Sequence, residues 1–170
     1  MSSVHKYILV RDASFFVIDF FSGDRAADLG RLLTNQVFRL KDRRGFLLKF
    51  TYTKNLKPGA SRSLILVPFR ETDVCPVEWL DYYICSCDLL KVNLAQGYFF
   101  RTTNKDNSVS DRPLLGSTIN NRLKKYMTDA NILSGETPHS FRVGLPNTLI
   151  VQQYGAKLFK LGLQARNLAQ

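Results

Sequence analysis

Residues 12–28 read DASFFVIDFFSGDRAAD, and this stretch holds one helix, its end and the start of another helix. The apolar residues of 12–21 recur at helical spacing on one side, at Ala13, Phe16, Val17, Phe20 and Phe21. Ser22-Gly23 is a helix-stop signal, and Asp24 is a suitable N-cap for a second helix that ends near Leu33. We therefore expect the domain to begin with packed helices.

A β-hairpin pattern follows this helical stretch. From Gly45 onward the apolar residues alternate with others, so that one side of the run carries Phe46, Leu48, Phe50 and Tyr52. The turn signal Lys57-Pro58-Gly59 separates this run from RSLILVP at residues 62–68, which predicts the returning strand. The pair predicts an antiparallel hairpin with basic residues near its tip.

Further helices are predicted after the hairpin. Pro76 begins one through Leu90, Ser117 caps another to about Ala130, and Pro138 begins the last. The polar stretch 104–113 predicts a loop. The expected fold class is therefore mainly α with a small antiparallel β-sheet (α+β), in one domain over residues 1–170.

The charge points to a polyanionic partner. Lys and Arg number 24 against 14 acidic residues, a net charge of +10. Such an excess favours nucleic acid first and an anionic membrane surface second. No apolar run is long enough to cross a bilayer, so we expect no membrane partner of that kind.

No cofactor is expected. Cys75, Cys85 and Cys87 form neither a disulfide framework nor a zinc-ligand spacing. The chain has no Gly-rich phosphate-binding loop and no acidic or Cys/His cluster, so the sequence predicts no metal and no small-molecule cofactor.

A phosphate site is suggested by the string TPHSFR at residues 137–142. Thr137 is a plausible N-cap with Pro138 at the first helical position. His139 and Arg142 are three residues apart and would share one face of that helix. A His and an Arg at a helix N-terminus are suited to binding phosphate.

Two more basic residues complete an ordered set: Arg25 in the motif Gly23-x-Arg-x-x-Asp28, and Lys54 near the hairpin tip. Followed by His139-x-x-Arg142, this set resembles the catalytic domain of the tyrosine recombinases, the phage-integrase family. The segments FFSGDRAADLGRL and TPHSFRVGL are most similar in sequence to eukaryotic mobile-element recombinases of the Crypton type. The resemblance spans nearly the whole chain.

The resemblance implies site-specific DNA cleavage and rejoining through a 3′-phosphotyrosine intermediate, as in DNA integration and recombination. It implies that Arg25 and Arg142 stabilise the charge of the transition state, with Asp28 in support. It also implies that Lys54 protonates the departing oxygen and that His139 is an acid–base partner of the nucleophile. Neither metal nor nucleotide is needed, and the implied location is the nucleus.

The C-terminal part departs from the family pattern. Leu163 stands where the family has His or Trp, and the family's tyrosine would fall nine positions later, beyond Gln170. Tyr154 lies too close to Arg142 to match the family spacing. We therefore expect an incomplete recombinase domain that lacks the nucleophile segment and the N-terminal DNA-clamping domain.

The expected partners are double-stranded DNA and other recombinase subunits, with no small-molecule cofactor. The candidate DNA-binding residues are Lys57 and Arg62 on the hairpin and Arg122, Lys124 and Lys125 on the predicted helix 117–130. Three functions stay open: a recombinase catalytic domain, an inactive DNA-binding or protein-interaction module on the same fold, and a basic RNA-binding domain.

Overall fold

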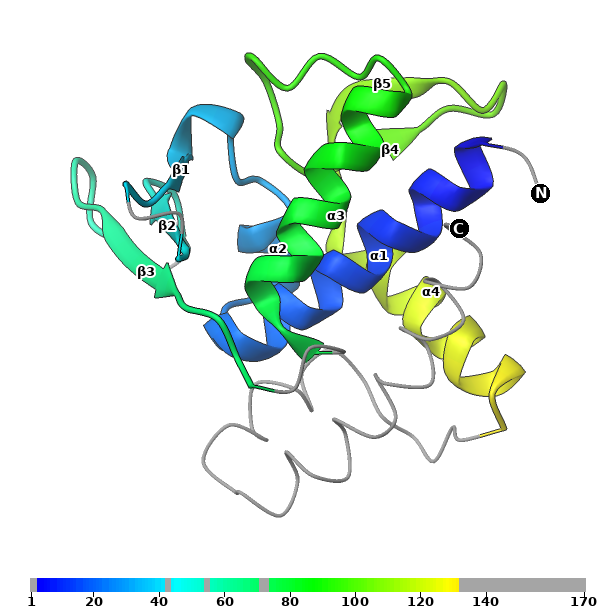
Figure 1. Cartoon of the computed structure of the whole chain (residues 1–170), viewed down its shortest axis with the longest axis horizontal. Coiled ribbons are helices and arrows are strands. Elements are labelled where there is room, and N and C mark those ends of the chain that lie inside the picture. The colour runs from blue at the N-terminus through cyan, green and yellow to red at the C-terminus, as the bar shows by residue number, and fades with distance from the viewer. Residues whose placement is uncertain (1–2, 42–43, 54–55, 71–73, 132–170) are drawn as a thin grey trace.

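The computed structural model describes residues 3–41, 44–53, 56–70 and 74–131 (Figure 1). Its helices are α1 (Ser3–Ser22), α2 (Ala26–Leu29), the 3-10 turn η1 (Thr34–Gln36), α3 (Pro76–Leu89) and α4 (Gly116–Asp129). Its strands are β1 (Val37–Arg39), β2 (Phe46–Phe50), β3 (Arg62–Leu66), β4 (Arg101–Thr103) and β5 (Val109–Pro113). Helices with small antiparallel sheets confirm the α+β class. The helix predicted from Pro138 lies outside the described residues.

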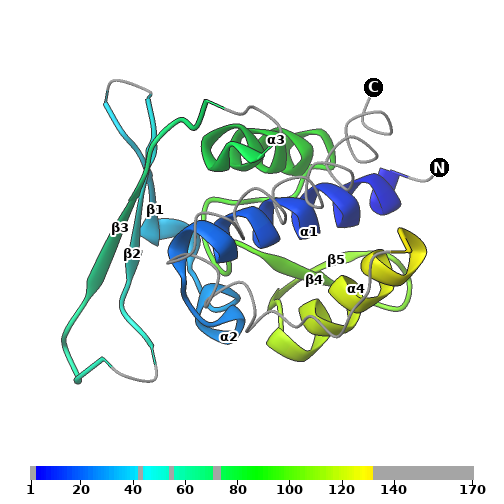
Figure 2. The ribbon, with the colours of Figure 1, turned by 90° about the horizontal axis from the view of Figure 1, so that it is seen from below.

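Helix α1 is the centre of the core. Figure 2 shows it between α3 on one side and β4, β5 and α4 on the other. Side chains on several sides of the helix are therefore buried, among them Tyr7, Phe15 and Ile18, each at most 1% exposed. The helix begins nine residues before the predicted start at Asp12, because it needs no single apolar face when it is covered on more than one side.

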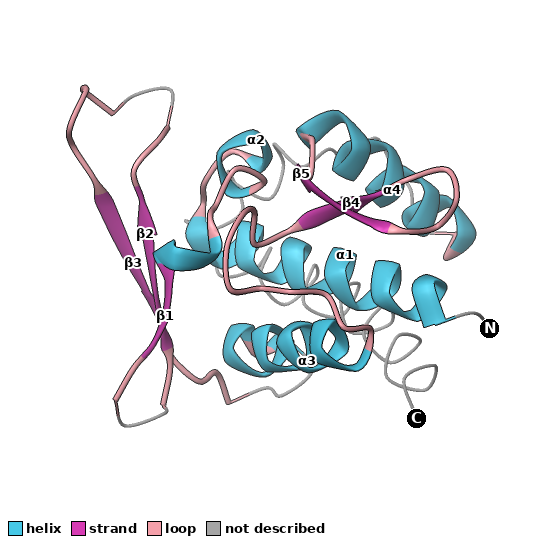
Figure 3. Cartoon of the chain, turned by 90° about the horizontal axis from the view of Figure 1, so that it is seen from above, coloured by secondary structure: helices cyan, strands magenta, loops and turns pink. Residues whose placement is uncertain are grey.

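The three-stranded sheet has the antiparallel order β1-β2-β3 and lies at one end of the molecule (Figure 3). Phe46, Leu48 and Phe50 share one side of β2 and are buried, as the alternation predicts, whereas Tyr52 lies beyond the strand and is 59% exposed. Ala60 N–H donates to the Lys57 carbonyl at 3.0 Å, and Gly59 has φ +79°, so the predicted turn is present. The sequence pattern did not predict β1, which pairs with β2.

Helix α2 is much shorter than predicted. It is a single turn whose N-cap is Arg25 and whose C-cap is Gly30, not a helix from Asp24 to Leu33. Asp24 forms an ion pair with Arg62 instead of capping the helix. The chain leaves the helix at Gly30, where a side chain would overlap the Leu114 carbonyl, and Leu33 then pairs with Tyr98 in a β-bridge. Tertiary pairing therefore overrides the helical pattern of residues 30–33.

The other boundaries agree more closely with expectation. Helix α3 has Pro76 at its first position, as predicted, and buries Val77, Leu80 and Cys87. Helix α4 begins at Gly116 with Leu115 as N-cap, so the assignment of Ser117 as the cap was wrong by two residues. The predicted loop 104–113 was wrong in its second half, because Val109–Pro113 forms β5 against β4. Within the described ranges, no helix has the length and apolar content needed to span a bilayer.

Candidate nucleic-acid interface

The positive charge is concentrated on the three-stranded sheet and its connections. In the described part of residues 37–70, basic residues are frequent and no acidic residue occurs. Those basic residues are Arg39, Lys41, Arg44, Lys49, Lys57, Arg62 and Arg70. Over the full sequence, residues 37–70 hold nine Lys or Arg and one acidic residue, so this segment carries +8 of the chain's net +10. Clustered cations of this kind favour a polyanion such as a nucleic-acid backbone.

Two of these cations are held by ion pairs. Arg39 contacts Asp81 of α3 at 2.6 Å, and its guanidinium lies 4.4 Å from the centre of the Phe46 ring. Arg62 contacts Asp24 at 2.7 Å. These pairs attach the sheet to the helices. Arg62 therefore has a structural role beside the DNA contact predicted for it.

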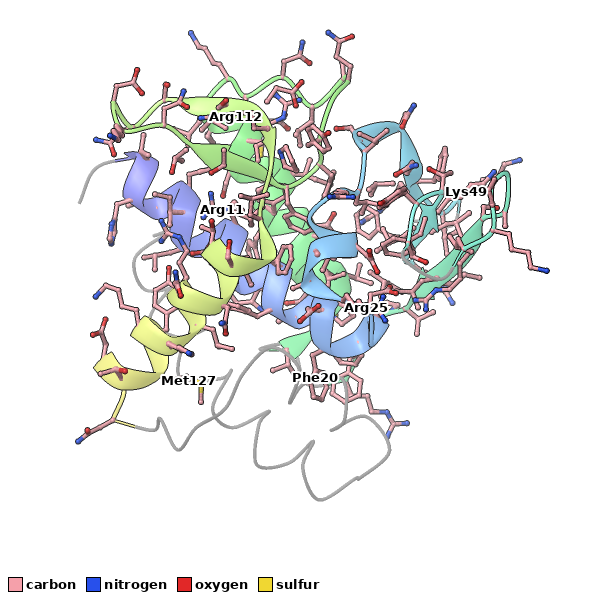
Figure 4. The ribbon with its side chains drawn as sticks, turned by 180° about the vertical axis from the view of Figure 1, so that it is seen from behind. Arg11, Phe20, Arg25, Lys49, Arg112 and Met127 are labelled. Atoms are coloured by element: carbon pink, nitrogen blue, oxygen red, sulfur yellow. The ribbon has the colours of Figure 1, made fainter. Side chains whose placement is uncertain are left out.

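Four other cations of the sheet unit are exposed and form no ion pair with any residue that the structure describes: Lys41, Lys49, Lys57 and Arg70. Lys49 lies on the outer side of β2, opposite Ser63 of β3 (Figure 4). Because these side chains are exposed and form no ion pair with a described carboxylate, they are available to an external anion.

Arg25 lies at the start of α2, beside the three-stranded sheet (Figure 4). Its carbonyl accepts the amide hydrogens of Asp28 and Leu29 at 2.8 and 3.0 Å, which fixes the backbone. Its partly exposed side chain forms no ion pair with any described residue, so pairing with Asp28 does not occur. The Asp24–Arg62 ion pair holds the hairpin end next to this position.

The remaining members of the predicted recombinase set cannot be placed. Lys54, His139, Arg142, Leu163 and Tyr154 lie outside the described residues. The backbone does show where the hairpin connection that contains Lys54 begins, because Phe50 pairs with Arg62 at that end of the sheet. The assembly of Arg25 with Lys54, His139 and Arg142 stays a prediction.

The predicted DNA-binding residues of α4 lie on a different part of the molecule from the sheet, as Figures 1 and 2 show. Arg122 contacts the buried Asp12 at 3.3 Å, and Lys125 contacts Asp129 at 2.8 Å along the helix. Lys124 is exposed and has no ion-pair partner in the described ranges. Of this group, Lys124 is the side chain best placed for an external anion.

Sequence reasoning missed a buried polar network between α1, α4 and β4. Arg11 is 1% exposed and donates to Oδ1 of Asp12 at 2.5 and 2.8 Å and to the Arg101 carbonyl at 2.9 Å. Oδ2 of Asp12 accepts the Tyr126 hydroxyl at 2.8 Å. Adjacent opposite charges in a sequence are usually solvated, so nothing in the pattern marked Arg11 and Asp12 as buried.

The hydroxyls of three core tyrosines are poorly suited to nucleophilic chemistry. Burial raises the pKa of Tyr7 to about 12, and burial likewise raises the pKa of Tyr83. Burial and the Asp12 carboxylate raise the pKa of Tyr126 above its usual value. A tyrosine nucleophile needs a lowered pKa or a base that is free to take its proton, and the carboxylate beside Tyr126, Asp12, is already held by Arg11 and Arg122. These tyrosines therefore have structural roles.

The Asp28 side chain forms no ion pair with Arg25 and instead lines a cleft between α2, the end of β2 and the segment before β4. The cleft is also lined by Arg31, Tyr52 and Tyr98. The sequence pattern did not predict it, since these residues come from three separate segments.

Metal binding finds no support in the described part of the chain, where no three His, Cys, Asp or Glu residues are grouped to hold an ion. Comparison with known proteins adds no assignment: no protein-family model matches the chain, and no curated protein sequence matches it.

Proposed function

We propose that this chain is a double-stranded-DNA-binding domain of the tyrosine-recombinase type, with the three-stranded sheet as its phosphate-contacting surface. The observation that carries the proposal is a set of four exposed cations on that sheet and its connections that form no ion pair with any described residue: Lys41, Lys49, Lys57 and Arg70. Arg25 adds a fifth cation beside the sheet. The motif resemblance supplies the recombinase type.

Duplex DNA fits this surface better than a small anion does. Its backbone carries one charge per about 1.7 Å of helix axis, so it can engage several separated cations at once. Affinity from such contacts comes largely from the release of condensed counterions and depends little on sequence. The proposed binding is therefore sequence-tolerant and weakens as salt rises.

The test is fluorescence anisotropy with a labelled duplex of about 20 base pairs, long enough to cover the sheet. The double variant Lys49→Ala/Lys57→Ala should bind at least tenfold more weakly than the unchanged chain, because each lost phosphate contact removes a share of the counterion release. Lys105→Ala is the matched control, since this exposed lysine lies in the β4–β5 turn away from the sheet.

Two results would change the proposed binding face or the proposed nucleic acid. If Lys124→Ala weakens binding and the sheet variant does not, the binding face is α4. If a double-stranded RNA of the same length binds more tightly than the DNA, the basic RNA-binding alternative replaces DNA binding.

A second candidate function is strand cleavage and rejoining. The observation that favours it is Arg25, partly exposed, without an ion pair among the described residues and held next to the hairpin end that leads to Lys54. A nicked suicide substrate traps any covalent protein–DNA adduct, which a denaturing gel detects. An adduct that is lost in Arg25→Ala and in Tyr154→Phe supports cleavage. Retained duplex binding without an adduct leaves DNA binding as the function of this chain.

A further inference from the structure

The cleft that contains Asp28 has the size and lining of a small-ligand site. Its volume is about 370 Å³, within the usual range for ligand pockets of about 300–1,000 Å³. Its walls come from α2 and the residues that follow it, from the end of β2 and from Tyr98. The cleft therefore lies at the junction of the helices and the three-stranded sheet, beside the cationic surface.

Asp28 is the most unusual residue of this cleft. It is 8% exposed, yet its carboxylate has no hydrogen-bond or ion-pair partner among the described residues. Arg31, one turn later, forms no ion pair with it, and only the Arg31 backbone amide bonds to the Asp28 carbonyl, at 3.1 Å. Its oxygens are not among the fully buried side-chain atoms that lack a partner, so they are open to the cleft and can accept from a ligand as they accept from water. The acceptor faces a space that a hydrogen-bond donor could enter.

The other walls offer a donor and aromatic faces. The Arg31 guanidinium lies 4.9 Å from the centre of the Tyr52 ring, and Tyr98 lines the same cleft. A flat ligand with donors on one edge and acceptors on another would satisfy both charged groups and could stack on an aromatic ring. A bare phosphate or carboxylate would be repelled by Asp28, and a simple cation would be repelled by Arg31.

Guanine meets these requirements better than the other bases. Its N1 and N2 groups present adjacent donors that a carboxylate can accept together, and its O6 and N7 present acceptors for an arginine fork. Adenine and cytosine each offer one amino group, and thymine offers one ring N–H, so none of them supplies two parallel donors. We propose that this cleft binds a guanine base, either as a free guanine nucleotide or as an unpaired base of a nucleic-acid strand.

The cleft is formed before any ligand arrives. Phe99 N–H donates to the Leu32 carbonyl at 2.8 Å, and Leu33 pairs with Tyr98. On the opposite wall, the Gln36 side-chain amide donates to the Thr51 hydroxyl at 2.5 Å. These bonds hold three chain segments together, so binding needs little rearrangement.

The strand-borne source rests on the proposed function, because the sheet would hold the phosphates while one base enters the cleft. The free-nucleotide source does not depend on it. Stacking on an aromatic ring stabilises an unpaired base by about 1–3 kcal/mol, and the carboxylate and guanidinium add selectivity for guanine.

The first arm of the test is isothermal titration calorimetry with GMP, AMP, CMP and UMP on the full chain. GMP should bind about tenfold or more tightly than the others, the discrimination expected of a good bidentate pair. Asp28→Asn should weaken GMP about tenfold and leave AMP unchanged. Asp88→Asn is the matched control, since it removes the same charge from an exposed site on α3 and should change nothing.

The second arm distinguishes the source. A ten-residue dT strand and the same strand with one central dG are compared by anisotropy. Preference for the dG strand without measurable GMP binding assigns the cleft to strand-borne guanine, and GMP binding without that preference assigns it to the free nucleotide. Equal binding of all four nucleotides together with no dG preference overturns the inference.

Folding and charge effects are separated by two further readouts. Asp28→Asn removes a charge that has no ion-pair partner among the described residues, so it should not lower the melting temperature. Arg31→Lys keeps the charge but loses the arginine fork, so it should reduce the GMP-to-AMP ratio. An unchanged ratio in both variants contradicts the inference. Duplex binding of the same samples reports on the proposed function independently, so failure of one does not hide failure of the other.

Discussion

Replacement of Asp12 by Ala should destabilise the domain strongly. The Asp12 carboxylate accepts two bonds from Arg11, one from the Tyr126 hydroxyl and a contact from Arg122. Arg11 is 1% exposed, so without Asp12 its charge stays buried and uncompensated. The variant therefore tests whether the network holds α1, α4 and β4 together.

The expected magnitude follows from these contacts. Removing one partner of a buried ion pair costs about 3–5 kcal/mol, and leaving the Tyr126 hydroxyl without an acceptor adds about 1 kcal/mol. The total is about 4–6 kcal/mol, against a typical stability of about 5–15 kcal/mol. Arg122 adds little, because it is 31% exposed and can reach water.

The assay is urea unfolding followed by circular dichroism, extended to a double-mutant cycle. Arg11→Met alone should also destabilise, whereas Arg11→Met/Asp12→Ala should cost less than the sum of the single variants by about 2 kcal/mol or more. Asp88→Ala on the exposed side of α3 is the control and should shift the free energy of unfolding by less than about 0.5 kcal/mol. An Asp12→Ala cost below about 1 kcal/mol would refute the network as a stabilising element.

The remaining predictions concern pH, thiols and backbone packing. Burial raises the pKa of Tyr7 and of Cys87 to about 12 each, so both stay neutral in the fold at pH values where the unfolded chain ionises them. The stability that Cys87 contributes should be complete below about pH 8 and that of Tyr7 below about pH 9, and both should fall as the pH rises to 12, by up to about 1.4 kcal/mol per pH unit for each group. Urea titrations at several pH values measure this fall. The exposed Cys85 should react with a thiol reagent at pH 8 while Cys87 stays protected until unfolding, and a reaction order opposite to this in mass spectrometry would contradict the burial of Cys87. Gly30→Ala places a Cβ against the Leu114 carbonyl and should cost about 1–3 kcal/mol; an unchanged melting temperature would show that the approach of α2 to Leu114 is looser than described.

Elements with one apolar face were predictable from the sequence. The spacing of Val77, Leu80 and Cys87 after Pro76 predicted α3, and the alternation of Phe46, Leu48 and Phe50 predicted β2. In both elements a single buried side repeats with the period of the backbone. The hairpin followed, since Gly59 permits the left-handed turn that joins its strands.

Elements without such a face were not predictable. Residues 3–11 of α1 are covered on more than one side and even bury Arg11, so their pattern has no clear helical period. Strands β4 and β5 form a ribbon with many polar, partly exposed side chains, and it is their pairing with each other that makes them strands. Long-range pairing of this kind leaves no signal in a local window of sequence.

The candidate site was likewise predictable from the sequence only in part. The pattern of basic residues placed Arg25 at a helix start and some cations on the hairpin, but it did not distinguish the hairpin from α4 as the more cationic unit. The sequence pattern could not show that Asp24 neutralises Arg62, because the two residues are 38 positions apart. It also could not show that Asp28 and Tyr98 line one cleft, because they are even further apart in the chain.

The salt dependence of duplex binding tests the central claim most directly. Five cations predict a slope of log affinity against log salt of about −4 to −5: Arg25 and the four of the sheet unit that have no ion pair with a described residue. The Lys49→Ala/Lys57→Ala variant should flatten that slope by about 2, one for each lost phosphate contact. A wild-type slope shallower than about −2, or the same slope in the variant, would contradict the assignment of the three-stranded sheet as the DNA-binding surface.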